Sequence, residues 1–311
     1  MKRLTENKII LLTRTTRLEE LVARFNTLGQ AKFYVEHLGA NFTEYELEHR
    51  NYKTALRDTE MQLRALGRVQ VLDRTFLTNF VFGNGDLVVV LGQDGLVANT
   101  LKYLREHPVI AVNPDPARWD GVLLPFGVND VSKIVLDVFA QKRSVREITM
   151  AKAELNNGQI LYGVNDLFIG PRSHVSARYQ ISIGLKHEQQ SSSGIIVSTG
   201  LGSTGWLKSI LAGARGIGSA FGKAFEPDIL KTFRWESDYL YYTVREPFPS
   251  KSSEATLVFG KVTPKQPLKL VSQMPENGVI FSDGIEADYL EFNSGTQAVV
   301  TLAEKKGHLV I

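Results

Sequence analysis

The stretch Asp86-Leu87-Val88-Val89-Val90-Leu91-Gly92-Gln93-Asp94-Gly95 decides the fold class of this chain. Its apolar, β-branched run predicts a strand buried on both faces, which is typical of a parallel sheet covered by helices. The run ends in a short turn that presents one carboxylate between two glycines. In open α/β sheets, ligands bind at the carboxyl ends of the strands, where glycines let backbone N–H groups approach phosphate oxygens.

A helix is predicted directly after this turn, over 96–105, and its positive end would point at the same place. The turn therefore predicts a phosphate site beside the carboxylate of Asp94. An alternative is a simple strand-to-helix turn in which Asp94 caps the helix.

Alternating strand and helix signals surround this stretch. They predict an α/β N-terminal domain over 1–141, with a parallel, Rossmann-like sheet. The predicted strands are 8–12, 69–72, 87–91 and 109–112, and the predicted helices are 18–38 (interrupted near Gly29), 55–66 (closed by Gly67), 96–104 and 131–140.

After residue 141 strand-like runs dominate, and turn residues separate them. This pattern of strand-like runs and turns predicts a β-rich, antiparallel C-terminal domain over 142–285 with one helix at 209–225. The strand-like runs are 159–169, 178–183, 195–199, 239–244, 255–259, 268–271 and 279–282.

Composition excludes several classes of protein. The 311 residues carry a formal net charge of +3 with no concentrated basic face, so we expect no nucleic-acid partner. The absence of cysteine removes disulfides, thiolate metal sites and cysteine nucleophiles. No apolar run has the length of a membrane span, so we expect no membrane partner and a cytoplasmic location. The six histidines show no metal-ligand spacing.

A second glycine-rich stretch, Gly200-Leu201-Gly202-Ser203-Thr204-Gly205, formally matches the dinucleotide fingerprint G-x-G-x-x-G. No strand ending in an acidic residue follows at the expected distance, which argues against a conventional Rossmann site. The stretch and the two residues before it instead offer hydroxyls at a helix N-terminus, suited to ribose or phosphate, from Ser198, Thr199, Ser203 and Thr204. An elaborate helix cap is the alternative.

Three polar turns stand near other strands. Asn165-Asp166 interrupts the apolar run 160–169, where a buried polar pair needs partners; a structural hydrogen bond to a neighbouring loop is one explanation. Asn113-Pro114-Asp115-Pro116 predicts a rigid turn at the same sheet edge as Asp94. Asp283-Gly284 predicts a type I′ hairpin turn.

Together these motifs resemble those of the NAD kinase family. Residues 92–96 are similar to its Gly-Gly-Asp-Gly-Thr loop, Asn165-Asp166 to its Asn-Glu pair, and Asp283-Gly284 to its late Asp-Gly element. Residues 198–206 resemble its Ser-Thr-x-x-Gly-Ser-Thr-Ala-Tyr segment. The resemblance spans nearly the whole chain.

The mitochondrial-type branch of the family is the closer likeness. Asn113-Pro114-Asp115-Pro116-Ala117-Arg118 resembles its Asn-x-Asp-Pro-Glu-Arg stretch, Thr15-Thr16-Arg17 its early Thr-Arg, and Ser192-Ser193-Gly194 its Ser-Ser-Gly run. This chain departs from the family where Gln93 replaces a glycine, Leu96 a threonine, Asp166 a glutamate, and Gly205-Trp206 an Ala-Tyr pair.

The resemblance implies an NAD kinase, which transfers a phosphoryl group from ATP or polyphosphate to the 2′-hydroxyl of the adenosine ribose of NAD. Asp94 would orient or deprotonate that hydroxyl. Gly92, Gln93 and Gly95 would bind the donor, which would bring Mg²⁺ on its phosphates. The implied NAD-binding residues are Asn113, Asn165, Asp166, Ser203, Thr204 and Trp206. The resemblance further implies a homodimer or homotetramer, with residues 286–311 returning to the first domain.

Three other functions stay open at this point. Gln93 and Leu96 favour a catalytically silent relative that binds NAD. A related kinase with another acceptor is the second alternative, because the diacylglycerol and sphingosine kinases share the Gly-Gly-Asp-Gly type of loop. The third is an oxidoreductase that uses the G-x-G-x-x-G match.

Overall fold

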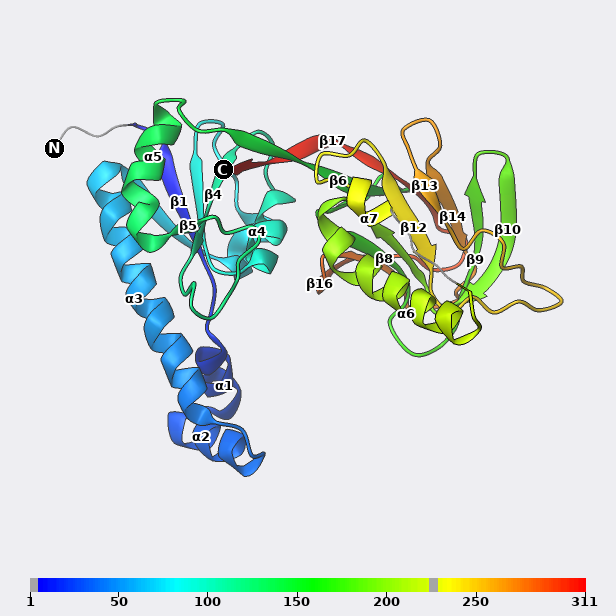
Figure 1. Cartoon of the computed structure of the whole chain (residues 1–311), viewed down its shortest axis with the longest axis horizontal. Helices are drawn as coiled ribbons and strands as arrows, with labels where there is room; N and C mark the ends of the chain where they lie inside the picture. Colours follow the sequence, from blue (N-terminus) through cyan, green and yellow to red (C-terminus); the bar gives the residue numbers. More distant parts are fainter. Residues whose placement is uncertain (1–4, 224–228) are drawn as a thin grey trace. The chain divides into compact units, whose positions relative to one another are not determined.

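The computed structural model describes residues 5–223 and 229–311. The chain divides into two compact units, Met1–Arg146 with His308–Ile311 and Glu147–Gly307 (Figure 1). The division lies five residues beyond the expected boundary at 141. Of the segment 286–311, expected to return to the first domain, residues 308–311 belong to the first unit and 286–307 to the second.

The first unit is built on a parallel sheet, as its alternating pattern predicts. Its strands lie in the order β2-β1-β3-β4, and every pairing between them is parallel. The predicted strand 87–91 is β3, and all five of its residues are buried, which explains its unbroken apolar run. The strands are β1 (Lys8–Thr13), β2 (Arg68–Asp73), β3 (Leu87–Leu91), β4 (Pro108–Asn113) and the short β5 (Phe126–Gly127), which pairs with β4.

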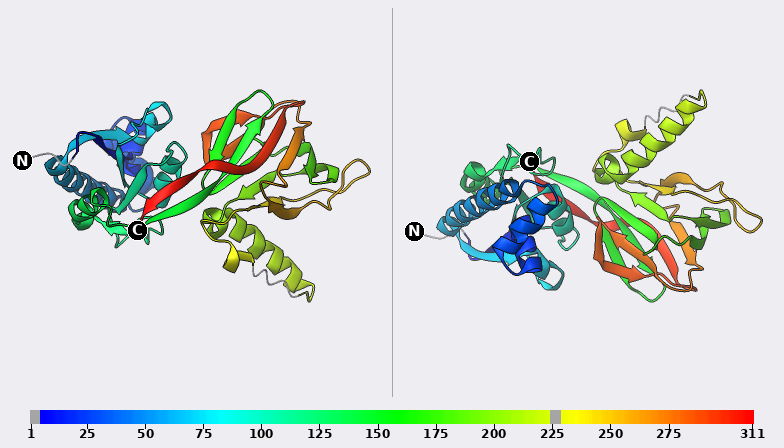
Figure 2. Two further views of the ribbon diagram at one scale, coloured as in Figure 1. Left: turned by 90° about the horizontal axis from the view of Figure 1, so that it is seen from above. Right: turned by 90° about the horizontal axis from the view of Figure 1, so that it is seen from below.

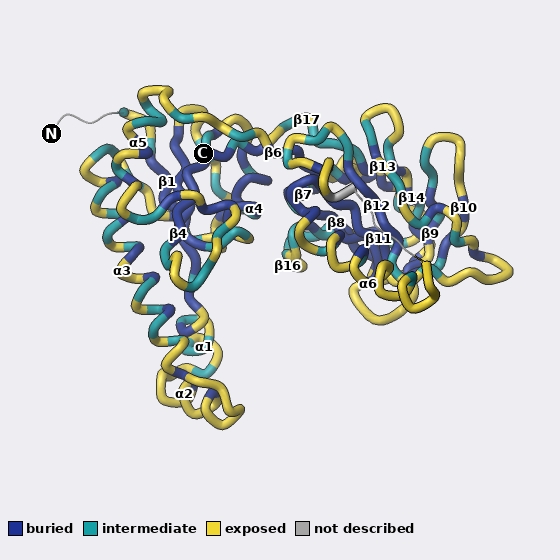
Figure 3. Tube along the Cα trace, viewed as in Figure 1, coloured by how far each residue is buried: buried dark blue, intermediate teal, exposed yellow. Residues whose placement is uncertain are grey.

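The helices are α1 (Arg17–Phe25), α2 (Leu28–His37), α3 (Phe42–Leu66), α4 (Asp94–Leu101) and α5 (Val131–Phe139), with 3₁₀ segments at Arg74–Asn79 and Val128–Asp130. Helices α1 and α2 pack on each other and on the start of α3, away from the sheet (Figure 1). Side chains of α3 and α5 share one core cluster with those of β1, β3 and β4. Figure 3 shows the buried strands between more exposed helices.

The helix boundaries confirm one expectation from the sequence and correct two others. The break expected near Gly29 in 18–38 falls at Asn26, which adopts φ 65°, and Thr27 then caps α2. The helix predicted over 55–66 begins at Phe42, where the Asn41 side chain accepts the N–H of Thr43. Gly67 follows α3 with φ −169°, so it is extended and does not form a left-handed cap.

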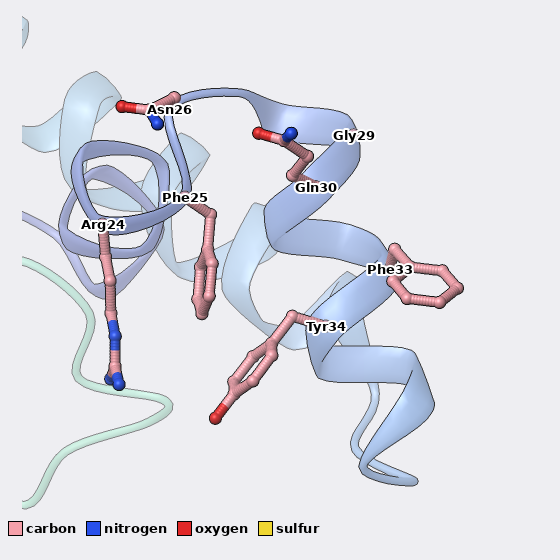
Figure 4. A pocket seen from close by; sticks show the side chains of 7 residues that line it. All are labelled: Arg24, Phe25, Asn26, Gly29, Gln30, Phe33 and Tyr34. Carbon is pink, nitrogen blue, oxygen red and sulfur yellow. The ribbon is translucent and has the colours of Figure 1, made fainter.

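Helices α1 and α2 enclose a shallow pocket of ≈ 510 Å³ (Figure 4). Its rings Phe25 and Tyr34 lie 4.3 Å apart between centroids, whereas Phe33 points outward and is 71% exposed. The lining residues are Arg24, Phe25, Asn26, Gly29, Gln30, Phe33 and Tyr34.

The second unit consists of two antiparallel sheets, which confirms the β-rich C-terminal domain. The first has the order β10-β9-β14-β17, and β6 pairs with β17 and β7. Figure 2 shows β6 (green) running alongside β17 (red). The second has the order β13-β12-β11-β8-β15-β16. The strands are β6 (Val145–Leu155), β7 (Ile160–Gly163), β8 (Asp166–Pro171), β9 (Ala177–Ile183), β10 (Lys186–Ser192), β11 (Ile195–Ser198), β12 (Leu240–Val244), β13 (Phe259–Val262), β14 (Leu268–Ser272), β15 (Gly278–Ser282), β16 (Ile285–Glu291) and β17 (Gln297–Val310).

The core of the second unit lies between these sheets. Tyr179, Tyr242 and Phe292 are its largest fully buried rings and come from both sides of the interface. Alternate residues of the strands point into this core, which is the pattern of two sheets packed face to face.

A 3₁₀ segment at Leu201–Thr204 leads into α6 (Trp206–Ala220), and a short helix α7 (Ile229–Thr232) follows. The helix predicted over 209–225 thus begins three residues earlier, and residues 224–225 lie outside the described residues. Leu207 and Leu211 anchor the first turns of α6 against Phe233 and Tyr241, while most of its second half is exposed.

The run 159–169 is not one strand. It forms β7 and β8, with a corner at Val164-Asn165 between them. Asn165-Asp166 therefore stands at a corner and not inside a strand, and its polarity follows from that position.

Candidate functional site

Asp94 lies at the carboxyl end of the central parallel strand, as the sequence predicts. Strand β3 ends at Leu91 and α4 begins at Asp94. The helix is capped by Gln93, whose side chain makes no capping hydrogen bond. The alternative in which Asp94 is the capping residue is therefore wrong.

The carboxylate of Asp94 is held by backbone of a later loop. It accepts the N–H of Leu123 at Oδ1 (2.8 Å) and the N–H of Val122 at Oδ2 (3.1 Å). These charge-assisted bonds fix the carboxylate beside the N-terminal end of α4. Any reacting hydroxyl that Asp94 contacts would share it with these two amides.

Gly92 and Leu96 pack against each other in the same turn. A Cβ added at Gly92 would lie 2.7 Å from Cδ2 of Leu96, which is itself only 6% exposed. Leucine at position 96 thus fills the space beside the loop backbone. Gly95, in contrast, has no atom within 4 Å of such a Cβ, so it leaves open space at the start of α4.

Asn113 lies at the end of the neighbouring strand. Because Leu91 pairs in register with Val112, the Asn113 turn and Asp94 lie at the same sheet edge, as expected. The Asn113 side chain is buried, donating to the Trp119 carbonyl (2.9 Å) and accepting the Asp115 N–H (3.0 Å). Asn113 and Asp94 thus both hold the loop that follows β4.

Asn165 and Asp166 lie in the second unit, at the corner between β7 and β8. The carboxylate of Asp283 accepts the backbone N–H groups of this corner: 2.6 Å to Asn165, 3.0 Å to Val164 and 3.3 Å to Asp166. Asp283 itself stands in the β15–β16 turn with φ 55°, and Gly284 follows with φ 71°. These angles are those of the predicted type I′ turn.

Thr199 holds the same corner from the other side. Its hydroxyl donates to the Val164 carbonyl (2.6 Å), and its N–H donates to the Asn165 carbonyl (2.9 Å). A Cβ at Gly202 would overlap the carbonyl oxygen of Asn165, so this position has room only for glycine. Asp283, Thr199 and Gly202 together fix the backbone that carries Asn165 and Asp166.

The Asp166 side chain is 8% exposed, and its carboxylate has no hydrogen-bond partner among residues 5–223 and 229–311. Burial, with the nearby charge of Asp283 as the smaller cause, raises its pKa to about 7. A buried carboxyl group with a raised pKa and no internal partner is characteristic of a site that awaits a ligand.

The serine and threonine motif leads into α6. Ser203 is buried, Thr204 is exposed, and both precede the helix within the 3₁₀ segment. Trp206 begins α6 and stacks on Phe168 at 5.8 Å between centroids with an interplanar angle of 6°. Phe168 was not predicted from the sequence, although it follows Asp166 by two residues and so lies on the same face of β8.

The residues expected from the sequence thus form two groups, each within its own unit. Gly92, Gln93, Asp94, Gly95 and Asn113 belong to the first unit. The second unit holds Asn165, Asp166, Ser203, Thr204 and Trp206. In the described part of the chain no group of three or more His, Asp or Glu side chains could hold a metal ion. None of the described helices is long and apolar enough to cross a membrane.

The chain matches no protein-family model and no curated protein sequence. Solved structures do match. Yeast NADH kinase complexed with NADH superimposes with a TM-score of 0.57 at 14% identity, covering 98% of this chain and 84% of that chain. An NAD kinase from Archaeoglobus fulgidus in complex with ATP gives 0.55 at 14% identity, covering 98% and 93%. The chain has the NAD kinase fold.

The NAD kinase fold confirms the two-domain architecture expected from the motifs. The superpositions show the fold, and at 14% identity they show the fold alone. The mitochondrial-type branch and the roles of the site residues stay predictions.

Proposed function

We propose that this chain is an NAD kinase, which transfers a phosphoryl group from ATP or polyphosphate to the 2′-hydroxyl of the adenosine ribose of NAD. The observation that carries the proposal is the corner at Asn165-Asp166. The side chains of Asp283 and Thr199 fix its backbone, yet the Asp166 carboxylate has no hydrogen-bond partner among the described residues. Asn165-Asp166 is the pair that resembles the Asn-Glu motif of the NAD kinase family, and the resemblance implies that it binds NAD.

Asp94 is the acid–base residue of the proposal. It would orient the 2′-hydroxyl and accept its proton as the oxygen attacks the terminal phosphorus of the donor. Its bonds to Val122 and Leu123 keep the carboxylate in one position, which lowers the entropic cost of alignment. Gly92, Gln93 and Gly95 would contact the phosphates of the donor.

In the second unit, Asn165 and Asp166 would bind the adenosine half of NAD. An ionised Asp166 would accept hydrogen bonds from ribose hydroxyls, and the Asn165 amide can donate and accept. Ser203 and Thr204, at the start of α6, would hold the nucleotide, and Trp206 would present its ring. In the first unit, Asn113 belongs to the proposed NAD set as well, although its side chain already bonds to its own loop.

Mg²⁺ would neutralise charge on the phosphates of the donor. The ion would enter on those phosphates. We further propose a homodimer or homotetramer and a cytoplasmic location.

A second candidate is a relative that binds NAD without phosphoryl transfer. Two observations favour it. Gln93 carries a side chain where the family loop has glycine, and the Asp94 carboxylate already accepts two backbone N–H groups.

The test is formation of NADP⁺ from NAD⁺ with Mg²⁺ and either ATP or polyphosphate, read by an NADP-specific coupled assay. We expect product with one donor, and turnover lower by about 10²-fold or more in Asp94→Asn with NAD binding retained. Asp120→Asn, an exposed aspartate of the same unit, is the matched control and should keep full turnover.

The outcomes separate the candidates. NAD binding by calorimetry without any NADP⁺ would identify the silent relative. Full turnover in Asp94→Asn would contradict the role of Asp94.

A further inference from the structure

The second unit contains a cavity of ≈ 350 Å³ that the motifs do not account for. Strands β8 and β15 and the first residue of α6 contribute to its wall. Of its lining residues, only Trp206 belongs to the proposed NAD site. The cavity is lined by Phe168, Pro171, Arg172, Trp206, Arg245, Val279, Phe281 and Glu286.

An aromatic platform forms one part of this cavity. The Phe168 ring stacks on Trp206, and on Phe281 at 4.8 Å between centroids. It also lies directly over Gly170 and Gly194, where an added Cβ would stand 2.7 and 2.8 Å from ring atoms. The two glycines therefore fix the ring, while Trp206 and Phe281 stay half-buried and keep ring surface open to a ligand.

Two guanidinium groups stand at the same cavity. Arg172 has no ion pair with any described residue, and its guanidinium lies 3.7 Å from the centroid of the Tyr289 ring. Arg245 lies 5.4 Å from the Trp206 ring centroid, and among the residues that the structure describes its one ion pair, of 3.5 Å, is with the exposed Glu246. Exposed ion pairs of this kind contribute little, so both cations remain available to an anion.

We propose that this cavity binds a nucleotide, with its base against the aromatic platform and its phosphate on Arg172 and Arg245. Rings that expose a face bind planar bases by stacking, and guanidinium groups bind phosphate oxygens in pairs of hydrogen bonds. Glu286 is the one carboxylate in the wall. It repels phosphate and accepts bonds from sugar hydroxyls, so it orients the ligand with the phosphate away from it.

The cavity shares Trp206 with the proposed NAD site, but it requires neither Asp94 nor Asp166, so it goes beyond the proposed kinase reaction. Its volume suits a mononucleotide and is at the lower end of small-molecule pockets, which hold roughly 300–1,000 Å³. AMP is therefore the probe, with adenosine and inorganic phosphate as its two halves.

The experiment is calorimetric titration of the full chain with each of the three probes. We expect AMP to bind more tightly than adenosine or phosphate. Arg172→Gln and Arg245→Gln should each weaken AMP binding by about 10-fold, because each removes a charge-assisted pair, and should leave adenosine binding unchanged. Arg215→Gln, an exposed arginine of α6 outside the cavity, is the matched control and should bind AMP like the wild type.

Equal affinity for AMP and adenosine, or unchanged AMP binding in both cavity variants, would overturn the proposal. Asn165→Ala separates this cavity from the proposed NAD site. If that variant weakens AMP binding as much as Arg172→Gln does, AMP occupies the NAD site and the cavity is not a nucleotide site. The kinase proposal is tested separately by the NADP⁺ assay, whose outcome does not depend on AMP binding in this cavity.

Discussion

The carboxylate of Asp283 accepts the backbone N–H of Asn165 at 2.6 Å, across 118 residues of sequence. The same carboxylate receives the N–H groups of Val164 and Asp166. A left-handed residue in the β15–β16 turn thus gathers three amides of the β7–β8 corner around one charge. This arrangement sets the direction in which Asn165 and Asp166 leave the backbone.

Replacement of Asp283 by asparagine is the sharpest test of this arrangement. Asparagine tolerates the left-handed φ of 55°, so the turn is kept while the charge and one acceptor oxygen are lost. We expect the free energy of unfolding to fall by about 1–3 kcal/mol, because the three amides lose the negative charge to which they donate and Val164 loses one of its two acceptor oxygens. NAD affinity should fall with it, measured by calorimetry.

Asp120→Asn serves as the control, because it removes an exposed carboxylate and should change neither quantity. Unchanged stability in Asp283→Asn would show that the negative charge of Asp283 contributes nothing to the stability of the corner.

The raised pKa of Asp166 predicts that the free energy of unfolding falls as the pH rises. Its pKa is about 7 in the folded chain, chiefly through burial, against a reference value of 3.8. Between these values the folded state holds a proton that the unfolded state has released, so stability must fall as the pH rises through this window. Below pH 4 and above pH 7 the contribution is constant.

Asp166→Asn removes this titration and keeps the shape of the side chain. The difference in unfolding free energy between Asp166→Asn and the wild type should grow from pH 4 to pH 7 in favour of the variant, reaching about 1–4 kcal/mol. Urea denaturation of both proteins at several pH values measures it. A difference that is flat across this range would mean that Asp166 is ionised at its ordinary pKa in the folded chain.

Two glycines near α6 predict opposite effects of the same substitution. Gly202→Ala would drive a methyl group into the Asn165 carbonyl, so we expect a loss of about 3 kcal/mol or more. Gly213 lies within α6, and a Cβ added there would have no neighbouring atom within 4 Å. Gly213→Ala should therefore stabilise the chain by about 0.5–1 kcal/mol through helix propensity. Thermal unfolding of the pair distinguishes them, and equal shifts would contradict the tight contact at Gly202.

The sequence predicted those parts of the site that depend on local pattern. The buried run 87–91 specified the central strand, and Asp94 had to follow at its carboxyl end. Asp283-Gly284 specified a turn because few residues adopt positive φ at both central positions. In each case the residues that determine the geometry are adjacent in the chain.

The parts that were missed depend on distant backbone groups. The partners of Asp94 are two N–H groups of Val122 and Leu123, which carry no side-chain signal. Asn165-Asp166 was interpreted as a polar break in a strand because its partner Asp283 lies 118 residues from Asn165 in the sequence. The fit of Gly202 against Asn165 likewise exists only after folding.

Gln93 and Leu96, the two departures in the phosphate loop, lead to separable predictions. Gln93 has φ −122° and ψ 164° at the N-cap, so its backbone does not require glycine, and its side chain makes no capping bond. Gln93→Gly should therefore change stability by no more than about 0.5 kcal/mol. If the side chain obstructs the phosphates of the donor, the variant should also raise kcat/KM for ATP several-fold.

Leu96→Thr should lower stability without improving donor use, because Leu96 is buried against Gly92. Loss of its packing and burial of a hydroxyl should cost about 1–3 kcal/mol, measured by urea denaturation. Donor use at saturating ATP should stay unchanged, since the side chain points into the protein. A rise in turnover with Leu96→Thr and none with Gln93→Gly would mean that residue 96, and not residue 93, contacts the donor in this chain.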